Sequence, residues 1–268
     1  MFDVDSYLRR IGCAGETGVD LATLRKLQHH HLMAIPYSSL AYDLADGAHI
    51  VDLDDDAIFR TSIADGHGGA CYHLNRLFHL LLRELGYDVT LLAGSTAEGQ
   101  AFGTDVEHMF NKVSLDGREW LVDVGYPGPT YLEPLLVDGG TQTQYGSQFR
   151  LVDTDDGIAL QRRGAVTRWG AIYTFTMTPR QWRDWKELED NFGEILADPT
   201  RDDTQEVLCG RAFAELAERT SDTVADGQAF MRQRRYLVVR NGREQVRTIT
   251  DDDEHQTLLS TILAGDLG

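Results

Sequence analysis

The chain has few cysteines, no long apolar run and no basic leader. Three cysteines in 268 residues, Cys13, Cys71 and Cys209, are too few and too scattered for a disulfide framework. No stretch reaches the roughly 18 apolar residues that suggest a transmembrane helix. The N-terminus lacks the basic and apolar regions of a signal peptide. We therefore expect a cytoplasmic protein with no membrane partner.

Basic residues are also scarce. Lys and Arg number 25 against 43 Asp and Glu, which gives a net charge of -18. Phosphates would repel such a chain, so general charge attraction to nucleic acid or to an anionic membrane is excluded. Hydrophobic residues make up 42% and charged residues 25% of the chain, which is ordinary for a globular protein. The length allows one large domain or two to three small ones.

Hydrophobic periodicity predicts helices first, then antiparallel strands, then a mixture. Asp20 is placed to cap a helix that begins at Leu21, and a second helix begins near Cys71 and ends at Gly86. Strands are expected at 89–93, 108–115, 118–124, 149–152, 158–161, 172–177, 235–239 and 244–249, with further helices at 180–220 and 251–263. This order is typical of an α+β fold and not of alternating βαβ units.

Cys71 follows a glycine-rich turn at the start of the second helix. Gly68 and Gly69 allow the backbone to turn tightly and a substrate to come close. The positive end of the helix dipole stabilises a thiolate, which is the nucleophilic form of cysteine. The same residues also fit a buried, inert cysteine in an ordinary helix, and spacing alone does not separate the two interpretations.

A hairpin supplies the partners that a cysteine nucleophile needs. Asp116-Gly117 is a strong two-residue turn signal, so Leu115 pairs with Arg118. In that register His108 and Asp123 lie on one face as diagonal neighbours, where their side chains can meet. A cysteine nucleophile requires a histidine base, and the histidine requires an orienting group. The alternative is a surface histidine and an aspartate that supports the turn.

Together these segments resemble the arylamine N-acetyltransferase family. The resemblance rests on His67-Gly68-Gly69-Ala70-Cys71, on His108 at the start of a strand, and on Asp123-Val124-Gly125-Tyr126. Further matches are Tyr7-Leu8-Arg9-Arg10-Ile11-Gly12, Leu27-Gln28-His29-His30-His31, Ile35-Pro36-Tyr37, Leu85-Gly86-Tyr87, Tyr173-Thr174-Phe175 and Asn191. They cover nearly the whole chain in the family's order.

The resemblance implies a three-part α+β fold. A helical bundle over residues 1–86 supplies the cysteine, and a central antiparallel β-barrel over 87–190 supplies the histidine and aspartate. A C-terminal α/β lid over 191–268 closes the site. The result is a Cys-His-Asp arrangement like that of cysteine proteases.

The chemistry implied is ping-pong acyl transfer, with Cys71, His108 and Asp123 as the catalytic residues. Cys71 takes the acyl group from a thioester, acetyl-CoA or an acyl carrier protein, and an aryl amine then takes it from Cys71. No tightly bound cofactor and no metal are expected. The residues expected to bind substrate are Tyr37, Gly69, Ala70, Tyr72, Phe110 and Tyr126.

Several residues depart from the family pattern near the expected pocket. His67 replaces an arginine, and Pro36-Tyr37-Ser38-Ser39 replaces a Pro-Phe-Glu-Asn segment. Pro127 removes a backbone N–H from the loop after the aspartate. A Ser-Pro-rich segment is replaced by Leu196-Ala197-Asp198-Pro199-Thr200. These departures favour a specialised donor or amine. Acyl transfer to an aryl amine is the main interpretation. The alternative within the same family is an amide synthase of antibiotic biosynthesis, which releases a carrier-bound polyketide by joining it to an aryl amine, often as a macrolactam.

Two weaker features and two alternative functions remain. Arg232, Arg234 and Arg235, in the one dense basic stretch, could hold the phosphates of coenzyme A or meet an acidic carrier protein, or could be a solvated hairpin. Three adjacent histidines, His29, His30 and His31, point in different directions on a helix and make a poor metal site. A cysteine hydrolase also uses a Cys-His-Asp set, and a catalytically silent relative would only bind an aromatic ligand.

Overall fold

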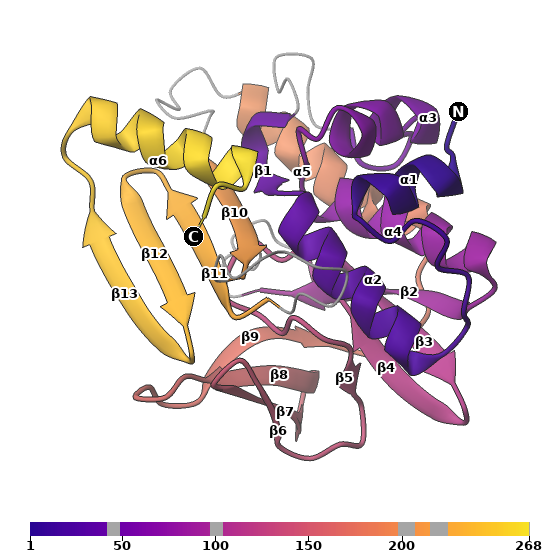
Figure 1. The fold of residues 1–268 in the computed structure, drawn as a ribbon. Helices are drawn as coiled ribbons and strands as arrows, with labels where there is room; N and C mark the ends of the chain where they lie inside the picture. The colour runs from indigo at the N-terminus through magenta and orange to yellow at the C-terminus, as the bar shows by residue number, and fades with distance from the viewer. Residues whose placement is uncertain (42–48, 97–103, 198–206, 215–224, 268) are drawn as a thin grey trace.

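The computed structural model describes residues 1–41, 49–96, 104–197, 207–214 and 225–267. The N-terminal part is helical (Figure 1) and contains α1 (Val4–Arg10), α2 (Leu21–Ala34), α3 (Asp55–Ile58), a π-helical turn (Phe59–Ala64) and α4 (Cys71–Leu85). Between α2 and α3 lie β1 (Tyr37–Ser38) and a 3-10 turn (Ser39–Ala41). This layer packs around α4, whose Leu74, Leu77 and Phe78 are fully buried.

The predicted caps of α2 and α4 are confirmed. The Asp20 side chain accepts a hydrogen bond from the backbone N–H of Thr23 at 2.8 Å, which satisfies one of the free donors at the start of α2. Gly86 ends α4 in the left-handed conformation, with φ 97°, which glycine adopts without steric cost. These two caps fix the ends of the helices that carry the N-terminal core.

The central part is an antiparallel sheet of eight strands in the order β5-β4-β3-β2-β9-β8-β7-β6. The strands are β2 (Asp88–Ser95), β3 (His108–Leu115), β4 (Arg118–Val122), β5 (Leu135–Leu136), β6 (Gln142–Gln144), β7 (Ser147–Thr154), β8 (Gly157–Arg163) and β9 (Gly170–Phe175). The predicted hairpin register is confirmed, because Leu115 pairs with Arg118 and Asn111 with Val122. The buried side chains of Phe110, Phe149 and Tyr173 lie within one hydrophobic cluster of this sheet.

Two glutamine side chains bridge the edges of this sheet, β5 and β6. The Gln142 amide accepts from the N–H of Leu136 at 3.0 Å and donates to its carbonyl at 2.8 Å. Gln144 accepts from the N–H groups of Leu132 and Glu133 and donates to the carbonyl of Glu133. The side-chain amides thus take the place of a backbone ladder and bring the sheet close to a closed barrel.

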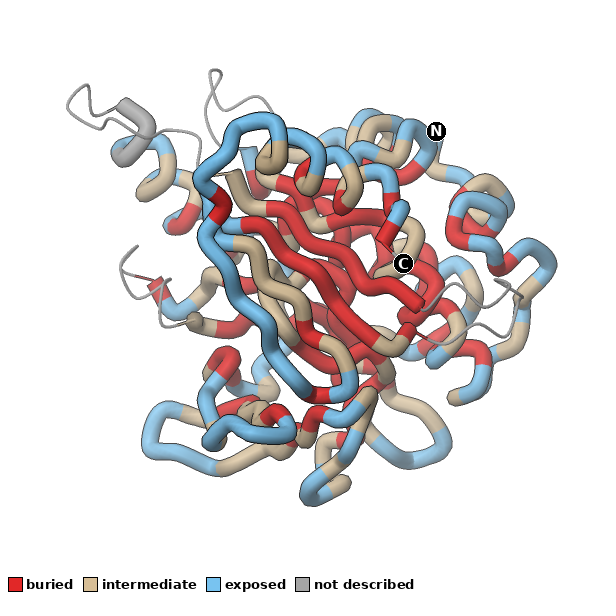
Figure 2. Tube along the Cα trace, turned by 60° about the vertical axis from the view of Figure 1, so that its left-hand side comes forward, coloured by how far each residue is buried: buried red, intermediate tan, exposed pale blue. Residues whose placement is uncertain are grey.

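The C-terminal part is a second antiparallel sheet in the order β1-β10-β11-β12-β13. It contains β10 (Leu208–Phe213), β11 (Gly227–Arg232), β12 (Arg235–Arg240) and β13 (Arg243–Thr248), and α6 (Asp252–Ala264) packs against it. Burial falls from the inner strands β10 and β11 to the fully exposed edge strand β13 (Figure 2). Strand β1 comes from the N-terminal part of the chain but belongs to this sheet. It therefore connects the helical part, which contains Cys71, directly to the C-terminal part.

The predicted fold class is confirmed: a helical N-terminal part, a barrel-like antiparallel sheet and a C-terminal sheet with a helix. The domain boundaries at 86/87 and 190/191 stay a prediction. Helix α5 (Lys186–Ala197), after a 3-10 turn (Trp182–Trp185), crosses the second of these boundaries. Its Glu189 carboxylate accepts hydrogen bonds from the N–H groups of Ile50 and Val51 at 2.7 and 2.9 Å, which fastens α5 to the helical part.

One prediction of secondary structure is wrong in part. The segment 180–220 was expected to be helical, but residues 208–213 form strand β10. Residues 198–206 and 215–220 of that segment lie outside the described residues, as do Asp198, Pro199 and Thr200 of the departure from the family pattern. The strand forms because β10 pairs with β1 on one side and β11 on the other, and this pairing outweighs local propensity.

No described helix is long and apolar enough to cross a membrane.

Buried histidines make the fold sensitive to acid. Burial lowers the pKa of His29 to about 4, of His31 to about 3 and of His73 to about 4. In the unfolded chain these groups titrate near 6.5, so the unfolded state binds more protons once the pH falls below about 6.5. Each such histidine then lowers the free energy of unfolding by up to about 1.4 kcal/mol per pH unit.

We therefore expect urea unfolding to give a markedly lower free energy of unfolding at pH 5.5 than at pH 7.5. His108, whose pKa is raised to about 10, acts in the opposite direction in this range, but the three histidines with lowered pKa values outweigh it. Most carboxylates, with pKa values near 4, contribute little. The variant His29→Gln lacks one of these titrations. Its free energy of unfolding should therefore fall less between pH 7.5 and pH 5.5 than that of the wild type. Equal stabilities of the wild type at the two pH values would contradict this account.

Candidate active site

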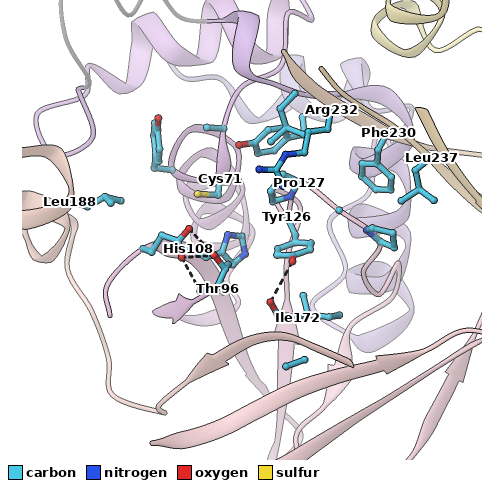
Figure 3. Close-up of a pocket in the computed structure, with 18 of the residues that line it drawn as sticks. Cys71, Thr96, His108, Tyr126, Pro127, Ile172, Leu188, Phe230, Arg232 and Leu237 are labelled. Carbon is cyan, nitrogen blue, oxygen red and sulfur yellow. Dashed lines mark hydrogen bonds between the residues drawn. The ribbon is translucent and has the colours of Figure 1, made fainter. Parts of the chain in front are cut away.

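A cavity of about 450 Å³ lies where the helical part, the barrel-like sheet and the C-terminal sheet meet (Figure 3). Cys71 and His108 both line it, and most of the other lining side chains are apolar or aromatic. The lining residues are Tyr37, Ala70, Cys71, Tyr72, Thr96, Glu107, His108, Tyr126, Pro127, Gly128, Pro129, Ala171, Ile172, Leu188, Phe192, Leu208, Phe230, Arg232, Arg235 and Leu237. Each of the three parts of the fold contributes to this wall.

The turn before Cys71 is fixed by close backbone packing. Gly68 has φ +75°, and a Cβ there would lie 2.0 Å from the carbonyl oxygen of Pro36. The Gly69 carbonyl accepts from the N–H of Ser38 at 3.1 Å, and the Ala70 N–H donates to Nδ1 of His73 at 3.1 Å. These contacts account for the glycines of the motif, and they place Cys71 as the first residue of α4.

His108 and Asp123 meet as the hairpin register predicts. His108 begins β3, and Asp123 directly follows the last residue of β4. His108 Nε2 lies 2.7 Å from Asp123 Oδ2, with the two side chains 2% and 0% exposed. Cys71 lies close enough to the His108 ring to contribute to its raised pKa, and both side chains line the same cavity. With Nε2 occupied by Asp123, Nδ1 is the ring nitrogen left for the thiol.

Three further donors hold the buried Asp123 carboxylate. Oδ1 accepts from Asn75 Nδ2 and from the Gly125 N–H, both at 2.9 Å, and Oδ2 accepts from the Tyr173 hydroxyl at 3.5 Å. A buried carboxylate is costly unless its lone pairs are satisfied. These contacts therefore satisfy the lone pairs of the carboxylate and fix its direction toward His108.

Asn75 is a site residue that the motif search missed. Its side chain also accepts from the Val124 N–H at 3.0 Å and donates to the Met109 carbonyl at 2.7 Å. It thus joins α4 to both strands of the hairpin. The sequence holds one signal for it, because Asn75 lies four residues after Cys71 and so on the same face of the helix.

The pKa of His108 is raised to about 10. Burial of the ring works in the opposite direction, but the charge and hydrogen bond of Asp123, followed by the interaction with Cys71, outweigh it. The imidazole is therefore protonated at neutral pH. A protonated imidazole beside a cysteine stabilises the thiolate form of that cysteine.

The structure places the predicted substrate-binding residues in two groups. Tyr37, Ala70, Tyr72 and Tyr126 line the cavity. Phe110 is not among the lining residues; it is fully buried, and its ring is parallel to that of His108 with the centroids 5.9 Å apart. Gly69 is likewise behind the cavity wall, and a Cβ there would lie 2.8 Å from Cβ of His73.

The three predicted arginines also separate. Arg232 and Arg235 are cross-strand neighbours at the β11–β12 turn, and both line the cavity. Arg234 is not part of this lining and pairs with Asp252 at the start of α6. Two arginines directly opposite each other on neighbouring strands repel. An anion bound between them would offset this repulsion, so the pair favours an anion-binding site.

Most of the apolar wall could not be predicted from the motifs. Leu188 and Phe192 come from α5, and Phe230 and Leu237 come from β11 and β12. Pro127, noted as a departure from the family pattern, is in the wall, whereas His67 is exposed outside it. Only the assembly of three distant segments brings these side chains together.

The three adjacent histidines of α2 have separate contacts. His30 Nδ1 lies 3.0 Å from the Ile11 carbonyl oxygen, and His31 Nδ1 lies 2.9 Å from the Tyr7 hydroxyl. His29 faces Glu133, with Nε2 3.9 Å from Oε1 of the carboxylate. Among the described residues, no group of three or more His, Cys, Asp or Glu side chains is arranged to hold a metal ion.

A cysteine at a helix start, a histidine and a buried aspartate around a cavity define a cysteine-dependent transferase or hydrolase. The family model described as N-acetyltransferase matches residues 20–267. The chain therefore belongs to the arylamine N-acetyltransferase family and is an acyltransferase enzyme.

Individual relatives support this assignment. The chain is 70% identical over 269 residues to proansamycin X synthase of Amycolatopsis mediterranei, covering 100% of this chain and 99% of that protein. It is 34% identical over 187 residues to arylamine N-acetyltransferase of Mycolicibacterium smegmatis, covering 66% of each. The Mycobacterium marinum arylamine N-acetyltransferase structure superposes with a TM-score of 0.78 at 28% identity, covering 99% of this chain and 95% of that one.

The same Mycobacterium marinum enzyme has also been solved in complex with CoA, and that structure superposes with a TM-score of 0.77 at 28% identity over 99% of this chain and 95% of that one. Thioesters of CoA thus fit the family as co-substrates.

Removal of the Asn75 amide should disturb Asp123 and with it the reaction of Cys71. In Asn75→Ala, Oδ1 of Asp123 loses a donor, and the Val124 N–H and Met109 carbonyl lose their partner in a dry interior. We expect a loss of about 1–3 kcal/mol in the free energy of unfolding and a slower reaction of Cys71 with an alkylating reagent at pH 7.

Asn111→Ala is the matched control, because Asn111 is equally buried and bonds to His79 and to the Asn75 carbonyl but not to Asp123. It should lower stability while changing the alkylation rate much less. Equal loss of alkylation rate in the two variants would contradict the role of Asn75 in positioning Asp123.

Proposed function

We propose that this enzyme is an amide synthase that moves a long acyl chain from a thioester to Cys71 and then to an aryl amine. When chain and amine belong to one molecule, the product is a macrolactam. The observation that carries this proposal is the cavity of about 450 Å³ at Cys71. Pockets of roughly 300–1,000 Å³ take drug-sized ligands, so this volume exceeds the needs of an acetyl group. The 70% identity to proansamycin X synthase supports the same choice.

In the first step the Cys71 thiolate attacks the thioester carbonyl. A bond forms between Sγ and the acyl carbon, the bond to the donor sulfur breaks, and the protonated His108 gives its proton to the leaving thiol. Asp123 holds the ring in place and stabilises its charged form. Acyl-Cys71 and neutral His108 remain.

In the second step the neutral aryl amine attacks the acyl carbon. The C–N bond forms, the C–S bond breaks, and a proton from the amine nitrogen passes to His108, which restores the ion pair with Cys71. Asp123 and, to a smaller extent, Cys71 raise the pKa of His108. Acylation of Cys71 removes the second of these contributions. The pKa of His108 therefore falls in the acyl-enzyme, which favours a neutral imidazole at the time it must accept a proton.

Incubation with a reactive thioester should give a single acyl adduct on Cys71, visible by intact mass. Cys71→Ala should give none. Cys13→Ala and Cys209→Ala are matched controls that should retain the adduct, because burial raises the pKa of each of those thiols to about 12. Absence of an adduct on the wild type, with donors of several chain lengths, would overturn the proposal.

The acyl-enzyme also separates the alternatives. An added aryl amine should remove the acyl group much faster than water does; removal by water alone would indicate the cysteine hydrolase. A long carrier-mimicking thioester should be used more efficiently than acetyl-CoA, and efficient turnover of acetyl-CoA would favour simple acetyl transfer over amide synthesis.

We further propose that Arg232 and Arg235 hold the phosphate of the donor, whether this is CoA or the phosphopantetheine arm of an acyl carrier protein. Both line the cavity, in a protein whose net charge of -18 otherwise repels anions. A cytoplasmic location stays part of this proposal.

Arg235→Ala should raise KM for a CoA thioester by roughly 10-fold or more, the effect of one charge-assisted hydrogen bond. With a short thioester that lacks phosphate, the same variant should resemble the wild type. Arg234→Ala is the control, because Arg234 pairs with Asp252 and does not line the cavity. A similar increase in KM for both variants, or for both donors, would argue against a phosphate site at Arg235.

A further inference from the structure

The catalytic cavity contains one carboxylate among the described residues that line it, that of Glu107. Glu107 immediately precedes His108, and both side chains line the same cavity as Cys71. An acidic side chain in the same cavity as a reacting thiolate is unfavourable for charge reasons alone. It also adds to the repulsion of an anionic donor. Its presence in a mostly apolar wall therefore points to a ligand group that the carboxylate can bind.

The Glu107 carboxylate is held in a fixed position. The Thr96 N–H donates to Oε2 at 2.8 Å, and the Thr96 hydroxyl lies 2.8 and 2.9 Å from the two carboxylate oxygens. The Glu107 backbone is held as well, because its carbonyl accepts from Trp185 Nε1 at 2.8 Å and its N–H donates to the Gly94 carbonyl. A group fixed before the substrate arrives binds with less loss of conformational freedom.

The carboxylate still has capacity for a ligand. Two oxygens offer about four acceptor positions, whereas the donors that contact them in the described part of the chain are the N–H and hydroxyl of Thr96. Both Glu107 and Thr96 line the cavity, so a substrate in it can reach the remaining positions. The site is therefore suited to a hydrogen-bond donor and not to an anion.

Acidic and basic groups occupy different sides of the cavity. Figure 3 shows Thr96 beside His108 on one side of Cys71 and Arg232 on another. The two substrates differ in the same way, since a phosphate-bearing thioester is anionic and an aryl amine offers N–H donors. The basic side suits the donor, and the acidic side suits the amine.

We propose that Glu107 binds the aryl amine by accepting a hydrogen bond from one of its N–H groups, with the nitrogen lone pair directed at the acyl carbon on Cys71. This inference rests on the amide-forming reaction proposed above. A primary aryl amine has two N–H bonds: one donates to Glu107, and the other loses its proton to His108 as the C–N bond forms and the C–S bond breaks. Glu107 itself takes up no proton.

The test compares wild type and Glu107→Gln in the two half-reactions. Gln has the same shape, but an amide whose oxygen accepts from Thr96 presents its NH₂ to the cavity, which is a donor facing another donor. Acylation of Cys71 by a phosphate-free thioester should be at least as fast as in the wild type, because the variant removes a negative charge from the cavity that holds the thiolate. The KM for a primary aryl amine in the second half-reaction should rise by roughly 10-fold, the effect of one hydrogen bond to a charged acceptor.

A second amine makes the result specific. N-methylaniline has one N–H, which must go to His108, so Glu107 has none to bind. The ratio of kcat/KM for aniline over N-methylaniline should fall about 10-fold from wild type to Glu107→Gln. If Glu107 only supported Thr96 structurally, the variant would slow both amines alike and leave the ratio of kcat/KM unchanged. That result would overturn the inference. If Cys71 of Glu107→Gln is not acylated, the two amines are compared in Glu107→Asp instead. That variant keeps the charge but shortens the side chain.

The outcomes also distinguish this inference from the proposed function. If the wild type forms no adduct on Cys71, or transfers none of it to an amine, the amide-forming reaction is wrong. If the wild type completes both half-reactions and the ratio of the two amines does not respond to Glu107, only the role of Glu107 is wrong.

Discussion

The buried hydrogen bond between His108 and Asp123 is the constraint around which the site is built. A fully buried carboxylate is tolerated only when every part of it has a partner. Asp123 obtains these from the hairpin, from α4 through Asn75 and from β9 through Tyr173. The same bonds therefore join the helical part to the barrel-like sheet. Gly125 adds a steric condition, because a Cβ there would lie 2.8 Å from Cα of Cys71. The contacts that hold the site together are thus also contacts between two parts of the fold.

The sequence predicted the parts of this arrangement that depend on local geometry. The Asp116-Gly117 turn sets the register of β3 and β4, and side-chain alternation then brings His108 and Asp123 to one face. Gly86 and Asp20 end and begin their helices by capping rules that act over a few residues. Periodicity predicts the order of helices, strands and mixed elements, and the family resemblance adds their division into a bundle, a barrel and a lid.

The apolar wall and strand β10 depend on contacts distant in the sequence. Leu188, Phe230 and Leu237 line the same cavity as Cys71 only because three parts of the chain pack together, and no local pattern marks them. Residues 208–213 were expected to be helical but form a strand. The prediction failed because the strand pairs with β1, which lies about 170 residues away in the chain. Polar residues such as Asn75 and Glu107 were missed for another reason: their importance lies in what they contact, and a motif records only spacing.

The two glutamines of β6 that bond to β5 and the segment before it have a consequence for how the cavity of this chain can vary. A closed ladder of backbone bonds fixes the circumference of a barrel, and changing it requires whole strands to shift. Here the side-chain amides of Gln142 and Gln144 hold the seam, so a substitution at either position removes hydrogen bonds from it. The same sheet carries Ala171 and Ile172 in the cavity wall. The seam is thus a point from which evolution can adjust the space for an acyl chain while leaving the reacting residues untouched.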